Sequence, residues 1–157
     1  MDGRYLSDLR DCSIELNRIK SWINSNPFDS NVRYLISYSV IKASGTIERI
    51  LKSILFDHVS QGANSEAVNY FSKHITEASF NPSPGAIERI LSDFDNSWGV
   101  AFKNAISGAQ QKGDLKSLVQ LRNDFAHGTA ITPSIETVLK YYISGVWILN
   151  EVCKIVV

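Results

Sequence analysis

The sequence predicts an all-α protein, a helical bundle with two long helices and a set of shorter ones between them. Apolar residues recur three or four positions apart through most of the 157 residues, which is the spacing of one face of an α-helix. No stretch alternates strictly between apolar and polar residues, the pattern typical of half-buried β-strands. The two longest periodic runs, 29–59 and 134–157, supply enough apolar side chains for one core, so we expect one domain over residues 1–157.

The first of these long helices follows a shorter amphipathic helix. Leucine and isoleucine recur at helical spacing over 5–23, and the turn 24–27, which contains asparagine and proline, ends that helix. Asp29 or Ser30 can cap the long helix that comes next. In its middle, the small residues 43–46 (Ala-Ser-Gly-Thr) lower helix propensity but let another helix approach closely. We therefore expect two helices to cross there.

Residues 60–113 contain shorter periodic runs separated by turn signals, and we expect them to form an insertion of short helices. The predicted pieces are a helix over 65–78, an exposed loop at 81–85, helices over 86–94 and 97–106, and a flexible connector over 108–113. Val68, Phe71 and Ile75 mark the inward face of the first piece. The two prolines of the loop cannot both lie inside a regular helix.

Residues 114–128 predict a helix that carries the candidate functional residues. Asp114 is placed to open it and Gly128 to close it, because aspartate favours the start of a helix and glycine its end. Its predicted buried stripe consists of Leu118, Leu121 and Phe125. An adjoining face carries Lys116, Val119, Arg122, Asn123, Ala126 and His127. After a loop, residues 132–134 (Thr-Pro-Ser) cap the long apolar helix over 134–157.

Three polar residues at the end of this helix suit phosphate chemistry. Arg122 supplies a permanent, forked cation that matches phosphate oxygens, and His127 can exchange a proton near neutral pH. Asn123, four residues before His127, can orient either group. RNA carries its own nucleophile, the 2′-hydroxyl beside each phosphate, so such groups can cleave it without a metal. An arginine and a histidine at this spacing are a weak signal alone, because chance produces them in many proteins.

Charge and composition limit the partners and the location that we expect. Sixteen basic residues balance sixteen acidic ones, so no overall positive field holds a long nucleic acid, and an RNA partner needs a local site. The first residues lack the apolar core of a signal peptide, and no run reaches the roughly 18 apolar residues that a membrane helix needs. We expect a soluble, cytoplasmic chain without a membrane partner.

The sequence suggests neither a cofactor nor a metal. The glycine-rich loops that bind ATP or NAD phosphates are absent. His58, His74, Cys12 and Cys153 match no metal-ligand spacing, and we interpret them as ordinary surface or buried residues.

The order of these features resembles the HEPN family of small all-α domains. Arg122-Asn123-x-x-x-His127 ends one helix, a loop and a long C-terminal helix follow, and an earlier long helix bears ASGTIERIL at 43–51. The likeness spans most of the chain, but only 118–128 and, more loosely, 43–55 are similar at the level of motifs. Within the family the chain is most similar to the prokaryotic branch named for its neighbourhood with RNA-ligase and phosphatase genes.

This resemblance implies a metal-independent endoribonuclease that works as a homodimer, with the motifs of both protomers lining one cleft. Arg122 would stabilise the phosphorane, His127 would act as acid or base, and Asn123 matches a polar residue that often follows the arginine. Glu48 matches an acidic position on the earlier helix that supports the motif; alternatively it is a surface residue paired with Lys52 at i+4. Residues 60–113 exceed a minimal domain of this kind and serve either partner binding or packing.

Three functions stay open at this point. The first is a ribonuclease acting on tRNA or messenger RNA as a toxin or defence effector, with an antitoxin protein as a further partner. The second is a catalytically inactive HEPN-like dimer that binds RNA, a nucleotide or a protein. The third is a helical interaction module in which Arg122 and His127 are only helix-terminal charges. For stability, we expect Phe125→Ala to cost about 3–5 kcal/mol as a core truncation and Arg122→Ala to be nearly neutral.

Overall fold

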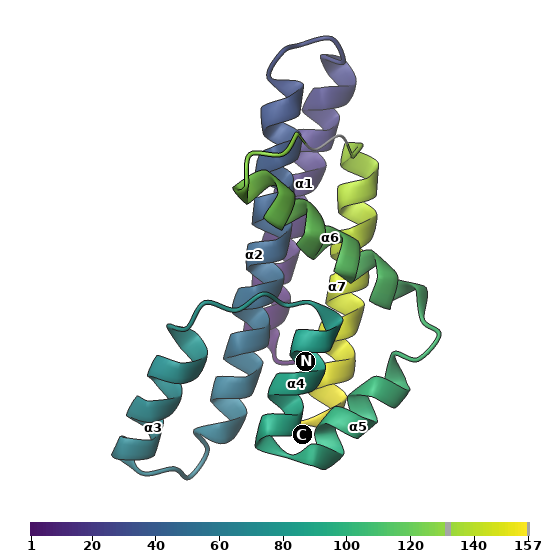
Figure 1. Cartoon of the computed structure of the whole chain (residues 1–157). Helices are drawn as coiled ribbons and strands as arrows, with labels where there is room; N and C mark the ends of the chain where they lie inside the picture. Colours follow the sequence, from purple (N-terminus) through teal and green to yellow (C-terminus); the bar gives the residue numbers. More distant parts are fainter. Residues whose placement is uncertain (131–132, 157) are drawn as a thin grey trace.

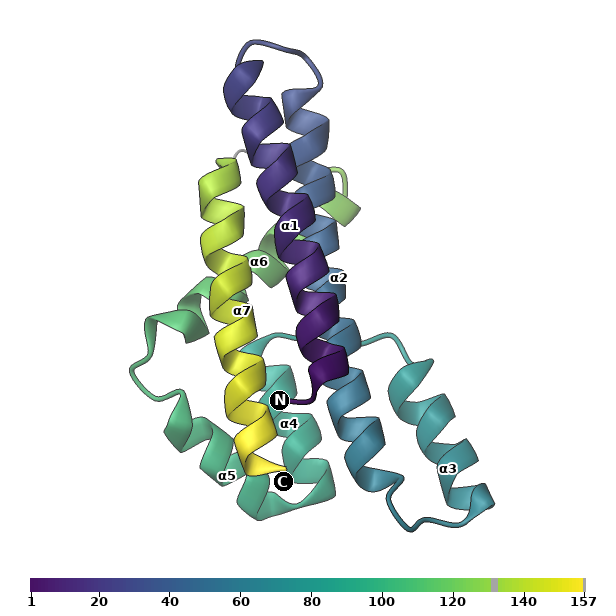
Figure 2. The same cartoon turned by 180° about the vertical axis from the view of Figure 1, so that it is seen from behind.

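Three long helices form the body of the fold: α1 (Gly3–Ser25), α2 (Val32–Val59) and α7 (Ile135–Ile155). The computed structural model describes residues 1–130 and 133–156, and within these ranges it contains helices and no strand, which confirms the all-α prediction. The three helices pack on one another side by side, with α1 running opposite to α2 and α7 (Figures 1 and 2). The sequence predicted only two long helices; α1 is the third.

The remaining elements are shorter and lie around these three. They are α3 (Ser65–Phe71), the π-helix η1 (Ser72–Thr76), α4 (Pro84–Phe94), α5 (Asn96–Ala105) and α6 (Gln110–Ala126). In Figure 1, α6 crosses in front of α2 and α7, whereas Figure 2 shows α1 on the opposite side. Among the described residues, none of the helices combines the length and the apolar content that a bilayer crossing requires.

The core lies between the long helices because each presents one continuous apolar stripe to the others. Its fully buried side chains include Leu16 of α1, Ile47 and Leu51 of α2, and Ile148 and Leu149 of α7. Burying an aliphatic side chain of this size is worth about 1.5–3 kcal/mol, so the stripes supply the main driving force for folding.

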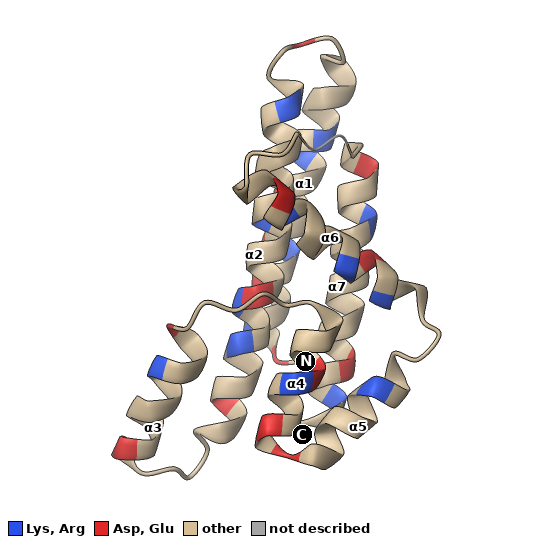
Figure 3. Ribbon diagram, in the orientation of Figure 1, with Lys and Arg blue, Asp and Glu red and all other residues tan. Residues whose placement is uncertain are grey.

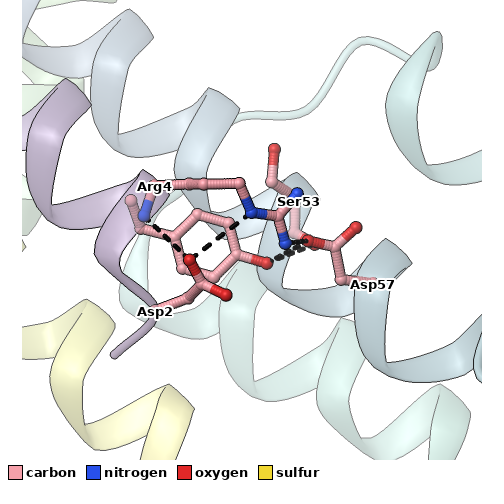
Figure 4. Close-up of polar contacts among 5 residues, drawn as sticks. Asp2, Arg4, Ser53 and Asp57 are labelled. Atoms are coloured by element: carbon pink, nitrogen blue, oxygen red, sulfur yellow. Dashed lines mark hydrogen bonds and ion pairs between the residues drawn. The ribbon is translucent and has the colours of Figure 1, made fainter.

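The start of α1 is fastened to the C-terminal half of α2 by a polar cluster (Figure 4). The Tyr5 hydroxyl donates to the Asp57 carboxylate and to the Ser53 carbonyl, the latter at 3.3 Å. Arg4 donates to the same carboxylate at 3.0 Å. Burial and the bond to Asp57 raise the pKa of the Tyr5 hydroxyl, so it stays protonated and keeps its donor role at neutral pH.

The predicted helix crossing is made by small residues on both partners. Ala43, Ser44 and Thr46 of α2 are buried, as the sequence indicated. Gly45 is not part of the crossing, since a Cβ there would meet nothing within 4 Å. The closest approach is at Gly145 of α7, where an added Cβ would lie 2.1 Å from the Ile47 Cδ1 atom.

We therefore expect Gly145→Leu to lower the free energy of unfolding by about 1–3 kcal/mol, because the new side chain overpacks the crossing of α2 and α7. Gly113→Ala is the matched control, since Gly113 lies inside α6 with nothing within 4 Å of an added Cβ. Alanine is a better helix former, so this control should stabilise by about 0.5–1 kcal/mol. Urea unfolding measures both; equal effects of the two variants would contradict the close approach.

Helix α6 begins earlier than the sequence predicted, and the reason is the role of Asp114. Ala109 precedes the first turn, so 110–113 are helical and not a flexible connector. Asp114 does not cap the helix. It is buried and accepts from the Ser144 hydroxyl at 2.8 Å, with the Lys140 ammonium 3.4 Å away. Its carboxylate is therefore used to join α6 to α7.

The buried face of α6 also differs from the prediction. Leu118 is buried as expected, but Leu121 is only half-buried and Phe125 is 39% exposed. Val119, which the sequence placed on the adjoining face with Arg122, is buried. The helix crosses the bundle instead of running along it, so its middle is covered while its last turn lies at the surface (Figure 1). The predicted core role of Phe125 is wrong.

Segment 60–113 has two parts with different packing. Its second part, α4 and α5, belongs to the core: Ile87, Leu91 and Phe102 are all 0% exposed. Its first part, α3 and η1, stands beside the lower half of α2 (Figure 1), and only Ile75 in it is buried. The predicted helix over 65–78 ends at Thr76, and its last turn is π-helical. That this segment is an insertion stays a prediction.

The start of α7 is capped as expected at Ser134, whose hydroxyl accepts from the Thr137 N–H at 3.1 Å. The cap assigned to Thr132 and the helix end assigned to Val157 lie outside the described residues.

Candidate functional site

The first two site residues meet where α6 crosses α2. The Arg122 guanidinium lies 3.6 Å from the Glu48 carboxylate, measured from Nη2 to Oε2. The Arg122 side chain is 34% exposed and that of Glu48 only 14%, so the carboxylate is enclosed while the guanidinium reaches solvent. The structure therefore places Glu48 where it can support Arg122.

Glu48 has further partners. Its Oε1 atom lies 2.7 Å from the Lys52 ammonium and accepts the Phe80 N–H at 3.3 Å. The sequence left two roles open for Glu48, pairing with Lys52 or supporting the motif, and both contacts are present. The pair with Lys52 is not a surface pair, because the Lys52 side chain is only 13% exposed.

Asn123 is held by a residue that the sequence did not indicate. The Asn81 side-chain amide donates to the Asn123 Oδ1 atom at 3.3 Å. Asn81 belongs to the loop between η1 and α4, which was predicted to be exposed. Pro82 of this loop and Pro84, the first residue of α4, are instead buried, because the loop passes over α2 (Figure 1) and bonds α6 through Asn123.

His127 lies at the surface, at the end of α6. Its backbone N–H donates to the Asn123 carbonyl at 3.0 Å, and its side chain is exposed. Gly128 follows with φ of +77°, a conformation that favours glycine and ends the helix as the sequence predicted. The Thr129 N–H then returns to the Asp124 carbonyl at 2.8 Å. His127 is thus fixed by its backbone while its ring remains open to solvent.

Arg122 and His127 do not face the same way within one chain. The backbone at His127 is still close to helical, with φ of −93° and ψ of 10°. Five residues at about 100° each separate the two side chains by roughly 140° around the helix axis. Within residues 1–130 and 133–156, no hydrogen bond or ion pair joins the His127 ring to Arg122. Asn123, four residues before His127, lies closer to it around the axis.

The cluster at the crossing can bind an anion. One carboxylate, Glu48, faces two cations, Lys52 and Arg122, which leaves one positive charge in excess. The excess lies on the exposed member, Arg122, whose planar fork suits a phosphate. In the view of Figure 3, basic and acidic residues are interspersed along the helices, so this excess is a local property.

The part of the chain that the structure describes contains no cluster of side chains suited to bind a metal ion. No three His, Cys, Asp or Glu side chains there come together as a metal site would require. His58 packs edge-on against Trp98 at 5.1 Å between ring centroids, and His74 packs against Tyr70 at 4.1 Å. We assign no residue to a metal or cofactor.

An exposed apolar stripe runs along α2 beside the end of α6. It consists of Tyr34, Tyr38 and Ile41, which share one face at i, i+4 and i+7. Next to it, a surface hollow of about 360 Å³ is lined by Tyr34, Phe125 and residues 128–130, the segment that follows His127. Through Tyr34 the stripe therefore adjoins the segment that follows His127.

Comparison with known proteins gives one family. A family model described as RiboL-PSP-HEPN matches residues 7–156, from the second turn of α1 to the end of α7. No curated protein and no solved structure matches the chain.

Proposed function

The chain belongs to the RiboL-PSP-HEPN family, and from this membership we propose that it is a metal-independent endoribonuclease that acts as a homodimer. Membership favours a nuclease or another RNA-related function. The observation that carries the finer proposal is Arg122, supported by Glu48 and partly exposed, on a helix that ends in an exposed histidine, His127.

The reaction uses the nucleophile that RNA supplies. The 2′-hydroxyl oxygen forms a bond to the adjacent phosphorus while a base removes its proton, and the bond from phosphorus to the 5′-oxygen breaks as an acid protonates that oxygen. The products carry a 2′,3′-cyclic phosphate and a 5′-hydroxyl. Arg122 neutralises the pentavalent phosphate, and His127 acts as the acid or the base.

The direction of the two side chains supports the proposed dimer. Because Arg122 and His127 are separated by roughly 140° around α6, one chain does not bring both to a single phosphate. A second copy related by twofold symmetry supplies another arginine and another histidine to the same cleft. The exposed stripe on α2, which adjoins the segment after His127 through Tyr34, is the surface that we propose the second copy covers.

We expect the protein to sediment as a dimer at micromolar concentration and Ile41→Glu to sediment as a monomer, because a buried, unpaired carboxylate in the stripe opposes association. Ile143→Glu is the matched control: Ile143 is an exposed isoleucine on α7, outside the stripe, and this variant should remain dimeric. A monomeric wild type, or an Ile41→Glu variant that dimerises as well as wild type, would contradict the proposed interface.

The activity is tested by incubating the purified protein with total RNA in EDTA. Cleavage into fragments with 2′,3′-cyclic phosphate ends supports the ribonuclease. RNA binding without cleavage supports the catalytically inactive dimer. The absence of both binding and cleavage supports the helical interaction module.

For the biological role, we propose a toxin or defence effector that cuts tRNA or messenger RNA in the cytoplasm and is neutralised by an antitoxin protein. Expression should then arrest growth, and His127→Ala should relieve the arrest.

A further inference from the structure

Residues 78–81 form a strap that touches the candidate site at three of its four positions. The Ala78 carbonyl accepts from the Lys52 ammonium, and the Phe80 N–H donates to the Glu48 carboxylate at 3.3 Å. The Asn81 amide donates to Asn123 at 3.3 Å. The strap thus contacts α2 through Lys52 and Glu48, and α6 through Asn123.

The strap is held firmly at both ends. On one side Ile75 of η1 is buried against the core. On the other, Pro82 and Pro84 are buried, and the Ser83 hydroxyl caps α4 by accepting the Ala86 N–H at 3.3 Å. Proline also restricts its own backbone torsion φ, which limits the conformations open to the chain just after Asn81.

Lys52 determines how strongly Glu48 holds Arg122. A full charge-assisted bond from an arginine to a carboxylate is about 2.7–2.9 Å long, whereas Arg122 lies 3.6 Å from Glu48. The other carboxylate oxygen is already taken by Lys52 and the Phe80 N–H. Since Lys52 neutralises Glu48, Arg122 is oriented by the carboxylate but remains available to a phosphate. Without Lys52, Arg122 would become the only cation on Glu48 and would be drawn onto it.

Asn81 acts on the other side of the motif. Its amide nitrogen donates to Asn123, the neighbour of Arg122, while its Oδ1 atom is buried and has no hydrogen-bond partner among the residues that the structure describes. A buried polar atom without a partner is unfavourable, so its presence in the strap calls for an explanation. The bond to Asn123 links the strap to the last turns of α6.

We propose that this strap sets the working position of Arg122 and Asn123, and that Lys52 and Asn81 are positioning residues of the site. The inference rests on the proposed ribonuclease activity. The Lys52 side chain is only 13% exposed and Asn81 is partly buried, so we expect both to act on the rate of cleavage through Arg122 and to leave substrate binding largely unchanged.

The test compares Lys52→Ala and Asn81→Ala with two control variants, Lys73→Ala and Asn69→Ala, which change exposed residues of the same segment. We expect kcat to fall about 10- to 100-fold in the first two, since misplacing a reacting group by about 1 Å costs on this order, with KM changed less than about threefold. Lys52→Arg should recover most of the rate, because it keeps the charge beside Glu48. The controls should match wild type.

A second measurement does not depend on cleavage. The Nε–H resonance of Arg122, assigned with Arg122→Lys, reports how its guanidinium is held. It should shift in Lys52→Ala and Asn81→Ala and stay in place in the two controls. Wild-type kcat and an unmoved resonance in both strap variants would overturn the positioning role even if the protein is a ribonuclease. Shifted resonances in the two strap variants, together with a wild type that cuts no RNA, would support the positioning role and refute the ribonuclease.

Discussion

Replacing His127 or Arg122 by alanine should lower RNA cleavage by at least about 100-fold while the helical spectrum stays that of wild type. Removing one group that stabilises charge in a transition state costs on the order of 100- to 1,000-fold, and removing a general acid or base costs a similar factor. The fold should tolerate both changes. The His127 side chain is exposed, and Glu48 keeps Lys52 and the Phe80 N–H when Arg122 is lost.

The controls separate catalysis from charge and from folding. Lys116→Ala removes an exposed cation from the same helix, and His74→Ala removes an exposed histidine elsewhere; both should cleave as wild type does. Arg122→Lys keeps the charge but loses the planar fork, so it should recover only part of the rate. We expect Arg122→Ala to lower the free energy of unfolding by less than about 1 kcal/mol, as for a partly exposed ion pair. A large fall in Tm would instead favour a structural role for Arg122.

Phe102→Ala should lower the free energy of unfolding by about 3–5 kcal/mol, the cost of emptying a closed aromatic site. Phe102 is 0% exposed and lies on α5, which packs against α4 and α7. The matched control is Phe125→Ala. This side chain is 39% exposed, so we expect a loss below about 1 kcal/mol, in place of the large loss predicted from the sequence.

Urea unfolding of these two variants also tests how segment 60–113 belongs to the domain. If α4 and α5 share one core with the long helices, Phe102→Ala shifts a single cooperative transition to lower urea. A separate early transition in this variant, with the main one unchanged, would mean that the short helices unfold by themselves.

The helices themselves could be predicted because apolar periodicity is a local signal. The extent of the second helix, from about 29 to 59, agrees with α2 to within a few residues. The predicted burial of residues on the faces of α6 was wrong in part. Phe125 and Val119 exchange their predicted environments because the crossing direction of a helix is decided by its neighbours, and no spacing along the chain encodes it.

The contacts of the candidate site could likewise be predicted from the sequence only in part. Arg122 and Glu48 are far apart in sequence yet meet as the resemblance implied, and Lys52 was visible as a helical neighbour of Glu48. Asn81 and the Phe80 N–H could not be found in advance. A backbone N–H has no residue type to mark it, and a single asparagine in a proline-rich loop is an ordinary turn residue. Contacts of this kind become visible only in the folded chain.

The central claim is that one cleft uses an arginine and a histidine from two copies of the chain. Mixing the inactive Arg122→Ala and His127→Ala dimers, with subunits allowed to exchange, tests it most directly, because a mixed dimer contains one intact Arg122 and one intact His127 on different chains. Our account predicts that RNA cleavage in EDTA returns in the mixture. A mixture that forms mixed dimers but cleaves no better than either parent would contradict it.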